Sequence, residues 1–452
     1  MLLAAALLSS CGEDEHTDPA SLSQALADAA PGEIVHAGAA RIEGAFVVPA
    51  GVRLVGAGPG ATIIVAPAGG TAITMMPGTP ATEVHDLTVE SDARAAIVAR
   101  GSGNVAVDNV QVNATRGVAF GAQEVSSLIL TNVTLRGPVN AENAASQPTD
   151  PAPTDTATHG LVLVRVADAH LTNVTSSGFG LFGALLLDST TAWSGGGASD
   201  NLATGLMVAG GTAMLDRLSL CRTLQGVRLY PAYAGVFAYA STVTTSSLEV
   251  CDGQGVGLLH DRSIVSHLDL SAHGNRDAAL WVQNTEQFEL AGAGSVLEDN
   301  VFAGVVVAAS SNITIRDARI DRTQTARRIL AEAGAVDVGD GIQLVGSVSN
   351  VLVSGVTLDS NQRVGLLIDG GGSSIAGVHL ESVFVNGTGT ELGAIAQTGE
   401  IPVGWDMGVT RGGATATNDL SFTGVLDTVG IVAPDRQPPL GAVADMGLDA
   451  LL

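Results

Sequence analysis

Between residues 199 and 369 the chain repeats one short pattern of polar and apolar positions. A polar residue, most often Asn, is followed about four positions later by a small residue and then by three or four apolar residues. The polar and small residues pair as Asn201 and Gly205, Cys221 and Gly226, Cys251 and Gly255, Asn275 and Ala279, Asn300 and Gly304, and Asn361 and Gly365. A short pattern that recurs in this way predicts a stack of similar structural units.

The spacing of the small residues gives the size of one unit. They stand at 160, 183, 205, 226, 255, 279, 304, 341 and 365, and most intervals are 21 to 25 residues. A second series of apolar triplets interleaves with them, for example at Leu128–Leu130, Phe288–Leu290 and Val351–Val353. We therefore predict an all-β fold, a single parallel β-helix of roughly a dozen coils with three short strands in each. A leucine-rich horseshoe has a similar period, but its Leu-x-x-Leu-x-Leu skeleton is absent.

The beginning of the predicted β-helix has its own pattern. Ser21–Ala30 has apolar residues at helical spacing and ends at Pro31-Gly32, so we predict a short capping helix. Very short strands follow, such as Phe46–Val48 and Thr62–Val65. This opening resembles that of the pectate-lyase-like right-handed parallel β-helices, in which a helix shields the first coil. The resemblance spans roughly residues 21–390 and implies a right-handed helix.

The pattern divides the chain into five regions. We predict a lipoprotein-type signal at 1–10, an acidic tether at 11–20, an N-terminal cap at 21–45, the parallel β-helix at 46–390, and last strands with a C-terminal tail at 391–452. Three insertions interrupt the period. We predict a surface loop at 137–158 and a short helical excursion at 322–340. We also predict a loop at 230–241, which contains every Tyr of the chain.

The repeated Asn residues are predicted to be structural. At a tight corner an inward side chain needs a backbone near the left-handed region, which Asn tolerates better than most residues. Stacked Asn amides can then bond along the helix axis and satisfy polar groups that would otherwise be buried without partners.

Cys221 and Cys251 are assigned to the same ladder position on consecutive coils. Stacked strands lie about 4.8 Å apart, within the Cα separation that a disulfide tolerates. We therefore predict a Cys221–Cys251 disulfide, with two stacked reduced thiols as the alternative.

The N-terminus resembles a bacterial lipoprotein signal. An apolar run from Met1 to Leu8 is followed by Ser-Ser-Cys11, although the expected basic residue ahead of the run is missing. The resemblance implies lipidation of Cys11, a membrane contact through that lipid, and a place in the bacterial cell envelope, with the outer membrane favoured. An ordinary secretory signal with a coincidental Cys is the alternative.

Charge restricts the partners. The 45 acidic and 20 basic residues give a net charge of −25, which disfavours nucleic acid. All 20 basic residues are Arg, so mechanisms that need a Lys base or Schiff base are excluded. The His residues form no zinc-binding pattern, so we predict no metal site, although calcium stays open as a cofactor.

The best candidate for chemistry is the Tyr-rich loop with the residues that the next coil brings to the same corner. Aromatic rings stack on sugars and Arg pairs with uronate carboxylates. The predicted ligand-binding residues are Tyr230, Tyr233, Tyr239, Arg228 and Trp281. The weaker catalytic candidates are His260, Asp261, Arg262, Glu249 and Asp269, and we expect Glu249, Asp269, His267 and Glu289 to point outward. In the alternative interpretation the loop folds on itself and these polar residues belong to solvated turns.

The family's catalytic motifs are absent. Polygalacturonase-like enzymes carry Asn-Thr-Asp, Asp-Asp, Gly-His-Gly and Arg-x-Lys, and none of these occurs here. Calcium pectate lyases use several Asp on neighbouring coils, which Asp252, Asp261 and Asp269 could imitate. No catalytic residue carries over from the resemblance.

The positions expected to point outward from the triplet strands form a largely apolar stripe. They are Val162, Met207, Arg228, Gly257, Trp281, Val306, Gln343 and Leu367. Such a stripe is too apolar to be left in water, so we expect the C-terminal tail, or else a partner, to cover it.

These observations predict a cell-envelope lipoprotein that binds a polysaccharide along its long face. One alternative is a polysaccharide lyase or glycoside hydrolase acting on an acidic glycan. The other is a noncatalytic adhesin-like or structural surface protein.

Overall fold

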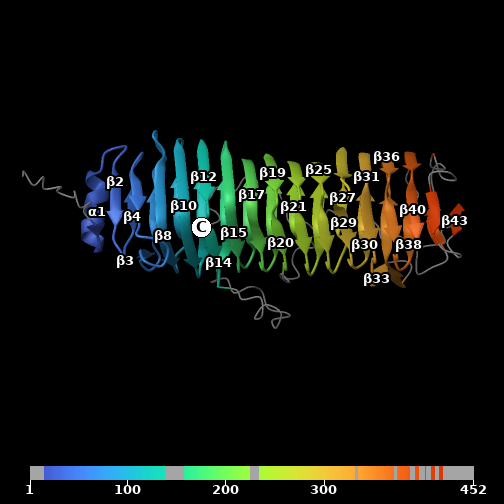
Figure 1. Cartoon of the computed structure of the whole chain (residues 1–452), viewed down its shortest axis with the longest axis horizontal. Coiled ribbons are helices and arrows are strands. Elements are labelled where there is room, and N and C mark those ends of the chain that lie inside the picture. Colours follow the sequence, from blue (N-terminus) through green and yellow to red (C-terminus); the bar gives the residue numbers. More distant parts are fainter. Residues whose placement is uncertain are drawn as a thin grey trace, which may run out of the picture.

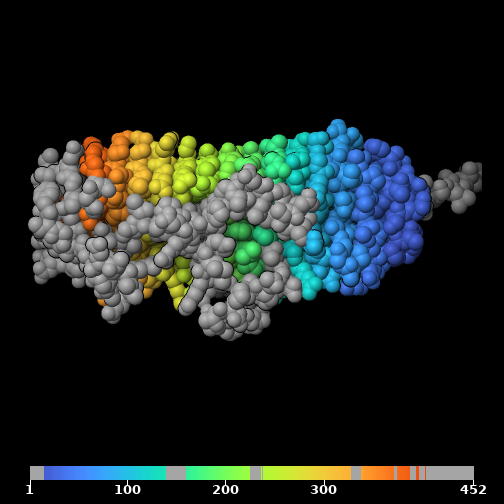
Figure 2. All heavy atoms as spheres, turned by 180° about the vertical axis from the view of Figure 1, so that it is seen from behind, coloured from blue at the N-terminus to red at the C-terminus, as the bar shows by residue number. Residues whose placement is uncertain are grey.

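The computed structural model describes residues 15–138, 157–223, 234–330, 334–370, 374–386, 392–396, 403, 409–412 and 417–420. Figure 1 shows these residues as one long stack of short strands, with α1 (Pro19–Asp28) at one end and β43 (Thr417–Leu420) at the other. Figure 2 shows the same order of coils from the opposite side. The described residues contain no helix that is long and apolar enough to cross a membrane.

The strands form three rows, and each coil contributes one strand segment to each row. Row 1 is a parallel sheet of 15 strands. Its strands are β4 (Phe46–Val48), β7 (Ile73–Met75), β9 (Ala95–Arg100), β11 (Gly117–Gln123), β14 (Ala157–Val164), β16 (Phe182–Leu187), β18 (Thr204–Ala209), β21 (Ala234–Tyr239), β24 (Val256–Asp261), β27 (Leu280–Gln283), β30 (Ala303–Ala308), β35 (Asp340–Val345), β38 (Val364–Asp369), β41 (Leu392–Ala396) and β43.

Rows 2 and 3 belong to one sheet, because several long strands bend from one row into the next. Row 2 contains β2 (Ile34–Ala37), β5 (Arg53–Val55), β8 (Thr82–Ser91), β10 (Asn104–Ala114), β12 (Ser127–Thr131), β15 (Ala169–Ser177), β17 (Thr190–Ser199), β19 (Thr212–Asp216), β22 (Thr242–Ser246), β25 (Ile264–Leu268), β28 (Gln287–Ala291), β31 (Ser311–Arg316), β36 (Val348–Ser354) and β39 (Ile375–Glu381). Row 3 contains β3 (Arg41–Glu43), β6 (Ile63–Val65), the second halves of β8, β10, β15 and β17, β13 (Thr134–Arg136), β20 (Ser219–Cys221), β23 (Glu249–Cys251), β26 (Ser271–His273), β29 (Ser295–Glu298), β32 (Ala318–Asp321), β37 (Thr357–Asp359), β40 (Val383–Asn386) and β42 (Val409–Gly412). A short β1 (Glu15–His16) pairs with β2.

The predicted parallel β-helix is confirmed. Each strand pairs in parallel with the matching strand of the next coil, as β24 does with β21 on one side and β27 on the other. Corresponding residues therefore lie about 4.8 Å apart along the axis. Alternate side chains of all three rows point inward and form one continuous, mainly aliphatic core.

The predicted capping helix is confirmed as α1, which begins two residues earlier than expected. Asp18 accepts hydrogen bonds from the backbone of Ala20 and Ser21 at the N-cap, and Pro19 occupies the first turn. Leu22 and Leu26 are buried against the first coil. The helix thereby covers apolar surface that the stack would otherwise leave open at its end.

The prediction of inward, structural Asn residues is confirmed. Asn201, Asn275, Asn300 and Asn361 are buried, and Asn275 Nδ2 donates to Asn300 Oδ1 at 2.9 Å. The expected left-handed backbone at the Asn itself is wrong. Positive φ belongs to the preceding residue, as at Asp299 (φ 55) and Ser360 (φ 54), whose side chain points to solvent while the turn sends the next side chain inward.

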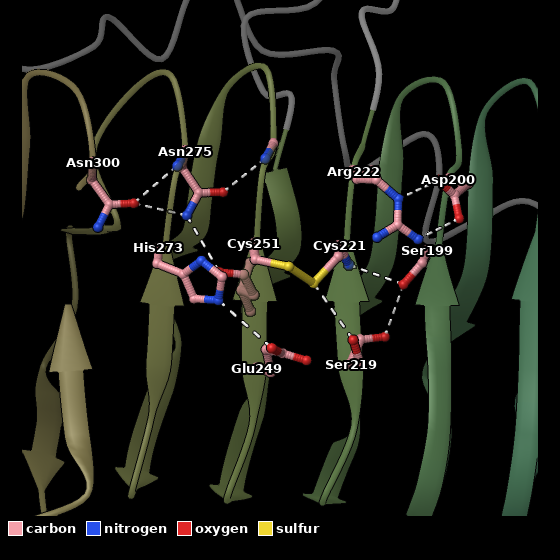
Figure 3. Close-up of a disulfide and its surroundings, with 12 residues drawn as sticks. Ser199, Asp200, Ser219, Cys221, Arg222, Glu249, Cys251, His273, Asn275 and Asn300 are labelled. Carbon is pink, nitrogen blue, oxygen red and sulfur yellow. Dashed lines mark hydrogen bonds and ion pairs between the residues drawn. A yellow bond between two sulfur atoms is a disulfide. The ribbon is translucent and has the colours of Figure 1, made fainter. Parts of the chain in front are cut away.

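The Cys221–Cys251 disulfide is confirmed, and it joins β20 to β23 (Figure 3). Its assignment to the ladder position is wrong. Both Cys precede the left-handed corner residue, and on these two coils the ladder position is occupied by Thr223 and Gly253. Both Cys stand two residues before the ladder position of their coil. They therefore still occupy equivalent positions on consecutive coils, which is why their spacing predicted the disulfide correctly.

The predicted helical excursion at 322–340 is also wrong. Ala326–Leu330 forms β33, which pairs in antiparallel fashion with β34 (Gly334–Val338). The segment therefore satisfies its backbone groups as a small hairpin beside the stack rather than as a helix. Most of the loop predicted at 137–158 lies outside the described residues.

From β9 to β41 the outward positions of row 1 in register with Val162 for which burial is described are buried, in agreement with the apolar stripe seen in the sequence, whereas Val47 on β4 is exposed. Val162, Met207, Trp281 and Val306 form part of a second hydrophobic cluster on this face. The position assigned to Gly257 belongs to Leu259, because the register on that coil is shifted by two residues. Arg228 and residues 421–452 lie outside the described residues, so a covering tail stays a prediction.

Candidate functional site

The corner after row 1 brings together residues from three consecutive coils. Tyr239, Asp261 and Gln283 end β21, β24 and β27, and they are register partners along the axis. The next residue of the last two coils, Arg262 or Asn284, has a positive φ and turns the chain toward row 2. The regular stacking of coils therefore aligns polar side chains at one corner, and we call Tyr239, Asp261, Arg262, Gln283 and Asn284 the Tyr239 corner.

Hydrogen bonds connect the Tyr239 corner. Arg262 donates to the Tyr239 hydroxyl at 3.1 Å, and its guanidinium carbon lies 5.6 Å from the centre of the Tyr239 ring. Asn284 Nδ2 donates to Asp261 Oδ1 at 2.9 Å, while Arg262 Nε lies 3.8 Å from the same oxygen. Arg262 is thus oriented by an aromatic ring and by a carboxylate at the same time.

The Tyr239 corner has an exposed layer and a buried layer. The Arg262 side chain is 52% exposed, whereas Asp261 and Gln283 are completely buried. Asp261 Oδ2 and Gln283 Nε2 have no hydrogen-bond partner among the residues that the structure describes. A free acceptor and a free donor thus lie on adjacent coils, where one hydroxyl group or one water molecule could satisfy both.

Trp281 belongs to the buried layer. Its side chain lies on the outer face of row 1, as predicted, but it is only 3% exposed and stacks on Phe302. Its Nε1 donates to Gln283 Oε1 at 3.1 Å, so it orients the Gln283 amide. A direct contact of its ring with a ligand stays a prediction. Arg228, Tyr230 and Tyr233 lie outside the described residues. The prediction that 230–241 is a loop is wrong for Ala234–Tyr239, which form β21 of row 1, and the outward position assigned to Arg228 belongs to Phe237.

His260 does not join the Tyr239 corner, because its side chain points into the core. Its Nε2 lies 3.0 Å from Nε2 of His267, whose Nδ1 in turn contacts the Thr245 hydroxyl at 2.8 Å. The expectation that His267 points outward is wrong, since both imidazoles are completely buried. Burial lowers the pKa of His267 to about 3, and burial together with His267 lowers the pKa of His260 well below its usual value.

The other catalytic candidates lie elsewhere on the coil. Glu249 is on β23 in row 3, where its carboxylate lies 3.6 Å from His273. Asp269 stands at the corner between rows 2 and 3 and accepts a hydrogen bond from the Gly294 backbone at 3.0 Å. Glu289, on row 2, forms an ion pair with Arg316 at 2.9 Å. The structure therefore unites Asp261 and Arg262 but separates them from Glu249 and Asp269.

The same separation affects calcium. Asp252, Asp261 and Asp269 follow rows 3, 1 and 2 respectively, so they stand at three different corners and do not share one cation site. Calcium binding elsewhere stays a prediction. Among the described residues, the cluster with metal-ligand geometry is Cys221, Glu249 and Cys251.

Two residues of the Tyr239 corner, Gln283 and Asn284, were missed by sequence reasoning. They stand 22 residues after Asp261 and Arg262, which is one coil in the base period. A search one period downstream of each candidate would have found them.

A shallow groove of about 330 Å³ crosses row 2 beside the Tyr239 corner. It spans β15, β17, β19 and β22, and the chain passes from Tyr239 at the end of β21 to Thr242 at the start of β22. Its polar lining includes His170, Thr172, Ser194, Asp216, Thr244 and Ser246. The Tyr239 corner therefore leads into a strand that the groove crosses, although on β22 the groove is lined by Thr244–Ser246 and not by the corner itself.

Comparison with known proteins gives structural similarity without a family. No protein-family model matches the chain, and no curated protein matches its sequence. Among solved structures it is similar to the A-module of mannuronan C-5 epimerase AlgE4 from Azotobacter vinelandii, with 13% identity over 90% of this chain and 97% of that chain and a TM-score of 0.41.

Two other similar structures are larger proteins. Tailspike protein 3 of bacteriophage CBA120 shares 14% identity over 93% of this chain and 61% of that chain, with a TM-score of 0.41. The catalytic domain of a GH87 α-1,3-glucanase shares 14% identity over 86% of this chain and 63% of that chain, with a TM-score of 0.25. These values transfer no activity or site residue, and the fold assignment rests on the strand register described above.

Proposed function

We propose that this protein binds a polysaccharide along the surface formed by the Tyr239 corner and the neighbouring groove on row 2. The observation that carries the proposal is the half-exposed Arg262 guanidinium, which Tyr239 and Asp261 hold in place. A fixed guanidinium binds carboxylate or hydroxyl oxygens with directional, charge-assisted hydrogen bonds. An aromatic ring beside it offers a face for a sugar ring.

The shape of the fold favours a polymer over a small ligand. Equivalent positions repeat about every 4.8 Å along the axis, so neighbouring coils can present similar polar groups to successive units of an extended chain. The groove supplies hydroxyl, imidazole and carboxylate groups over four coils. Solenoids commonly use such long surfaces for extended binding partners.

The geometry favours binding over cleavage. Glycoside hydrolysis usually needs two carboxyl groups that face one sugar bond. Asp261 is fully buried, and Glu249 and Asp269 lie on other faces of the coil. We therefore include no catalytic step in the proposal.

We further propose that the protein works in the bacterial cell envelope, anchored by a lipid on Cys11. The support is the sequence alone, in which an apolar run precedes Ser-Ser-Cys11 and an acidic segment follows. A lipid anchor and a long binding surface together would hold a polymer close to a membrane.

The proposal is tested with two matched Arg variants. Arg262 and Arg165 occupy the same corner position on different coils, and Arg165 pairs with Glu124 rather than with an aromatic ring. In a panel of neutral and uronate polysaccharides, Arg262→Ala should weaken binding about tenfold or more, which is the value of one charge-assisted hydrogen bond. Arg165→Ala should weaken binding clearly less, because no aromatic ring adjoins this guanidinium among the described residues.

Binding is measured by affinity electrophoresis, with and without calcium. The net charge of −25 repels polyuronates, so their binding should strengthen when calcium or salt is added. Equal losses in Arg262→Ala and Arg165→Ala, or no binding to any member of the panel, would contradict the proposal.

A further inference from the structure

The disulfide lies within a cluster of side chains that are typical metal ligands. Cys221, Cys251 and His273 are register partners on three consecutive coils of row 3. Glu249 stands two residues before Cys251 on the same side of β23, and Figure 3 shows its carboxylate beside His273 and below the disulfide. Four potential ligands from three coils therefore converge on one small patch, which we call the Cys221 cluster.

The distances within the Cys221 cluster suit a small cation. The two sulfur atoms and a Glu249 carboxylate oxygen all lie within 4.8 Å of one another. His273 Nε2 is 3.6 Å from Glu249 Oε1. A tetrahedral zinc ion with bonds of about 2.0–2.3 Å needs ligand atoms about 3.3–3.8 Å apart, so His273, which lies outside that group of three residues, would have to turn toward the sulfur atoms to complete such a site.

Among the described residues, the guanidinium of Arg222 beside the cluster pairs with Asp200 and has a weaker electrostatic interaction with Glu249. Arg222, the nearest guanidinium drawn in Figure 3, points away from the sulfur atoms and forms two hydrogen bonds with Asp200, at 2.6 and 2.8 Å. The His273 side chain is 35% exposed and that of Glu249 is 47% exposed, so an ion can approach from solvent. Two thiolates and one carboxylate would carry three negative charges, which favours a divalent cation.

We propose that the Cys221 cluster is a redox-gated zinc site. In the disulfide form both sulfur atoms are consumed by their mutual bond. Reduction by a dithiol breaks the Cys221–Cys251 bond, delivers two electrons and two protons to give two thiols, and converts the reductant to its own disulfide. Zinc then displaces the two thiol protons and binds both thiolates, His273 and Glu249.

The repetitive fold explains why the site can survive reduction. The ligands lie on strands that stay paired with their neighbours on both sides, so opening the disulfide leaves the backbone positions in place. The Cα atoms of the two Cys are 4.4 Å apart, which is compatible with two ligands of one ion. A pre-formed ligand set favours metal binding because little ordering remains to be done.

The experiment uses Co²⁺ as a spectroscopic substitute for Zn²⁺. The full chain is reduced with a phosphine under argon and titrated with Co²⁺, and Zn²⁺ is then added in competition. We expect a thiolate-to-cobalt charge-transfer band that appears only after reduction and disappears when Zn²⁺ displaces Co²⁺. The oxidised protein should show no such band.

Four variants identify the ligands. His273→Ala and Glu249→Gln should each weaken metal binding about tenfold or more, since even residues that only support a ligand cost that much. Both variants keep the disulfide, so thiol titration before reduction checks their folding. His170→Ala, at an exposed position of row 2, and Glu289→Gln, at a half-buried one, are the matched controls and should bind metal as the parent does.

Two results would overturn the proposal. One is that the reduced parent binds Co²⁺ no more tightly than Cys221→Ser/Cys251→Ser. The other is that His273→Ala and Glu249→Gln bind as tightly as the two controls, because the metal would then be held by an unassisted pair of thiolates.

Discussion

The two imidazoles of His260 and His267 share a hydrogen bond in the interior, between rows 1 and 2. At most one of the two rings can be protonated in this arrangement, because one Nε2 must donate and the other must accept. The edge of Phe288 faces His267 from the next coil, so its surroundings there are apolar. The depressed pKa values therefore describe a cost of charging the folded protein rather than a catalytic adjustment.

Acid should weaken the fold through these residues. The folded pKa of His267 is about 3, below its usual 6.5, so the unfolded chain binds a proton that the folded chain does not. This stability is complete above about pH 6.5 and is lost as the pH falls toward 3, by about 1.4 kcal/mol per pH unit. Between pH 7.5 and pH 5, the free energy of unfolding of His267→Gln should therefore fall by about 2 kcal/mol less than that of the parent.

Urea unfolding at the two pH values measures this difference. His170→Gln is the control, since it makes the same replacement at an exposed rather than a buried imidazole. Parallel pH profiles for the parent and His267→Gln would show that the buried pair does not govern acid sensitivity.

His267 also shows where sequence reasoning failed at single residues. On β25 the outward positions include Ile264 and Leu268, each 47% exposed, while Val265 and His267 point inward. Hydrophobicity alone favours the opposite orientation, and a slip of one residue reverses every side chain of a strand. The inward Asn residues were predictable because their position at a corner, rather than their polarity, determines their direction.

At the scale of elements, the disulfide fastens two neighbouring strands of row 3. It links β20 to β23 and closes a loop of 30 residues, which includes the whole of one coil. On the chain-entropy model a loop of this length contributes about 3–4 kcal/mol. By contrast, the hairpin of β33 and β34 adds no strand to any row, and its Ala-rich sequence gave a helical prediction because local propensity is a weak guide against strand pairing.

Removing the disulfide should lower stability by about 3–4 kcal/mol. Urea unfolding of Cys221→Ser/Cys251→Ser, compared with the parent in the absence of metal, measures the loss. A reducing agent should lower the free energy of unfolding of the parent to that of the variant and should leave the value of the variant unchanged. A parent that is insensitive to reductant would show that this coil is held by its neighbours alone.

At the scale of the whole molecule, repetition made the architecture predictable. Each coil has the same three strands and the same corners, so a period of 21 to 25 residues was enough to give the fold class. The Tyr239 corner was only partly predictable. Tyr239, Asp261 and Arg262 were found from their residue types, whereas Gln283 and Asn284 are found only by adding one period to Asp261 and Arg262. The insertions carry no period, so the strands Ala326–Leu330 and Gly334–Val338 did not follow from the repeat.

The proposed anchor gives a prediction for the complete chain. Cys11→Ser, expressed with its own N-terminus in a bacterial host, should lose lipid attachment and move from the membrane fraction to the soluble fraction. Fractionation with antibody detection, together with labelling by a radioactive fatty acid, measures the change. A variant that stays in the membrane fraction would contradict anchoring through Cys11.

The direction of the disulfide has a mechanical meaning for a protein held at one end. The bond joins corresponding positions on adjacent coils, so it lies along the axis on which an anchored, polymer-bound solenoid would be pulled. Under tension coils would peel away one at a time, and each would release about 70–80 Å of chain. The coil between Cys221 and Cys251 would release nothing until the bond was reduced. The maximum extension of a single pulled molecule would thus be about 100 Å shorter in its oxidised form. The redox state would therefore set how far the protein can extend as well as how stable it is.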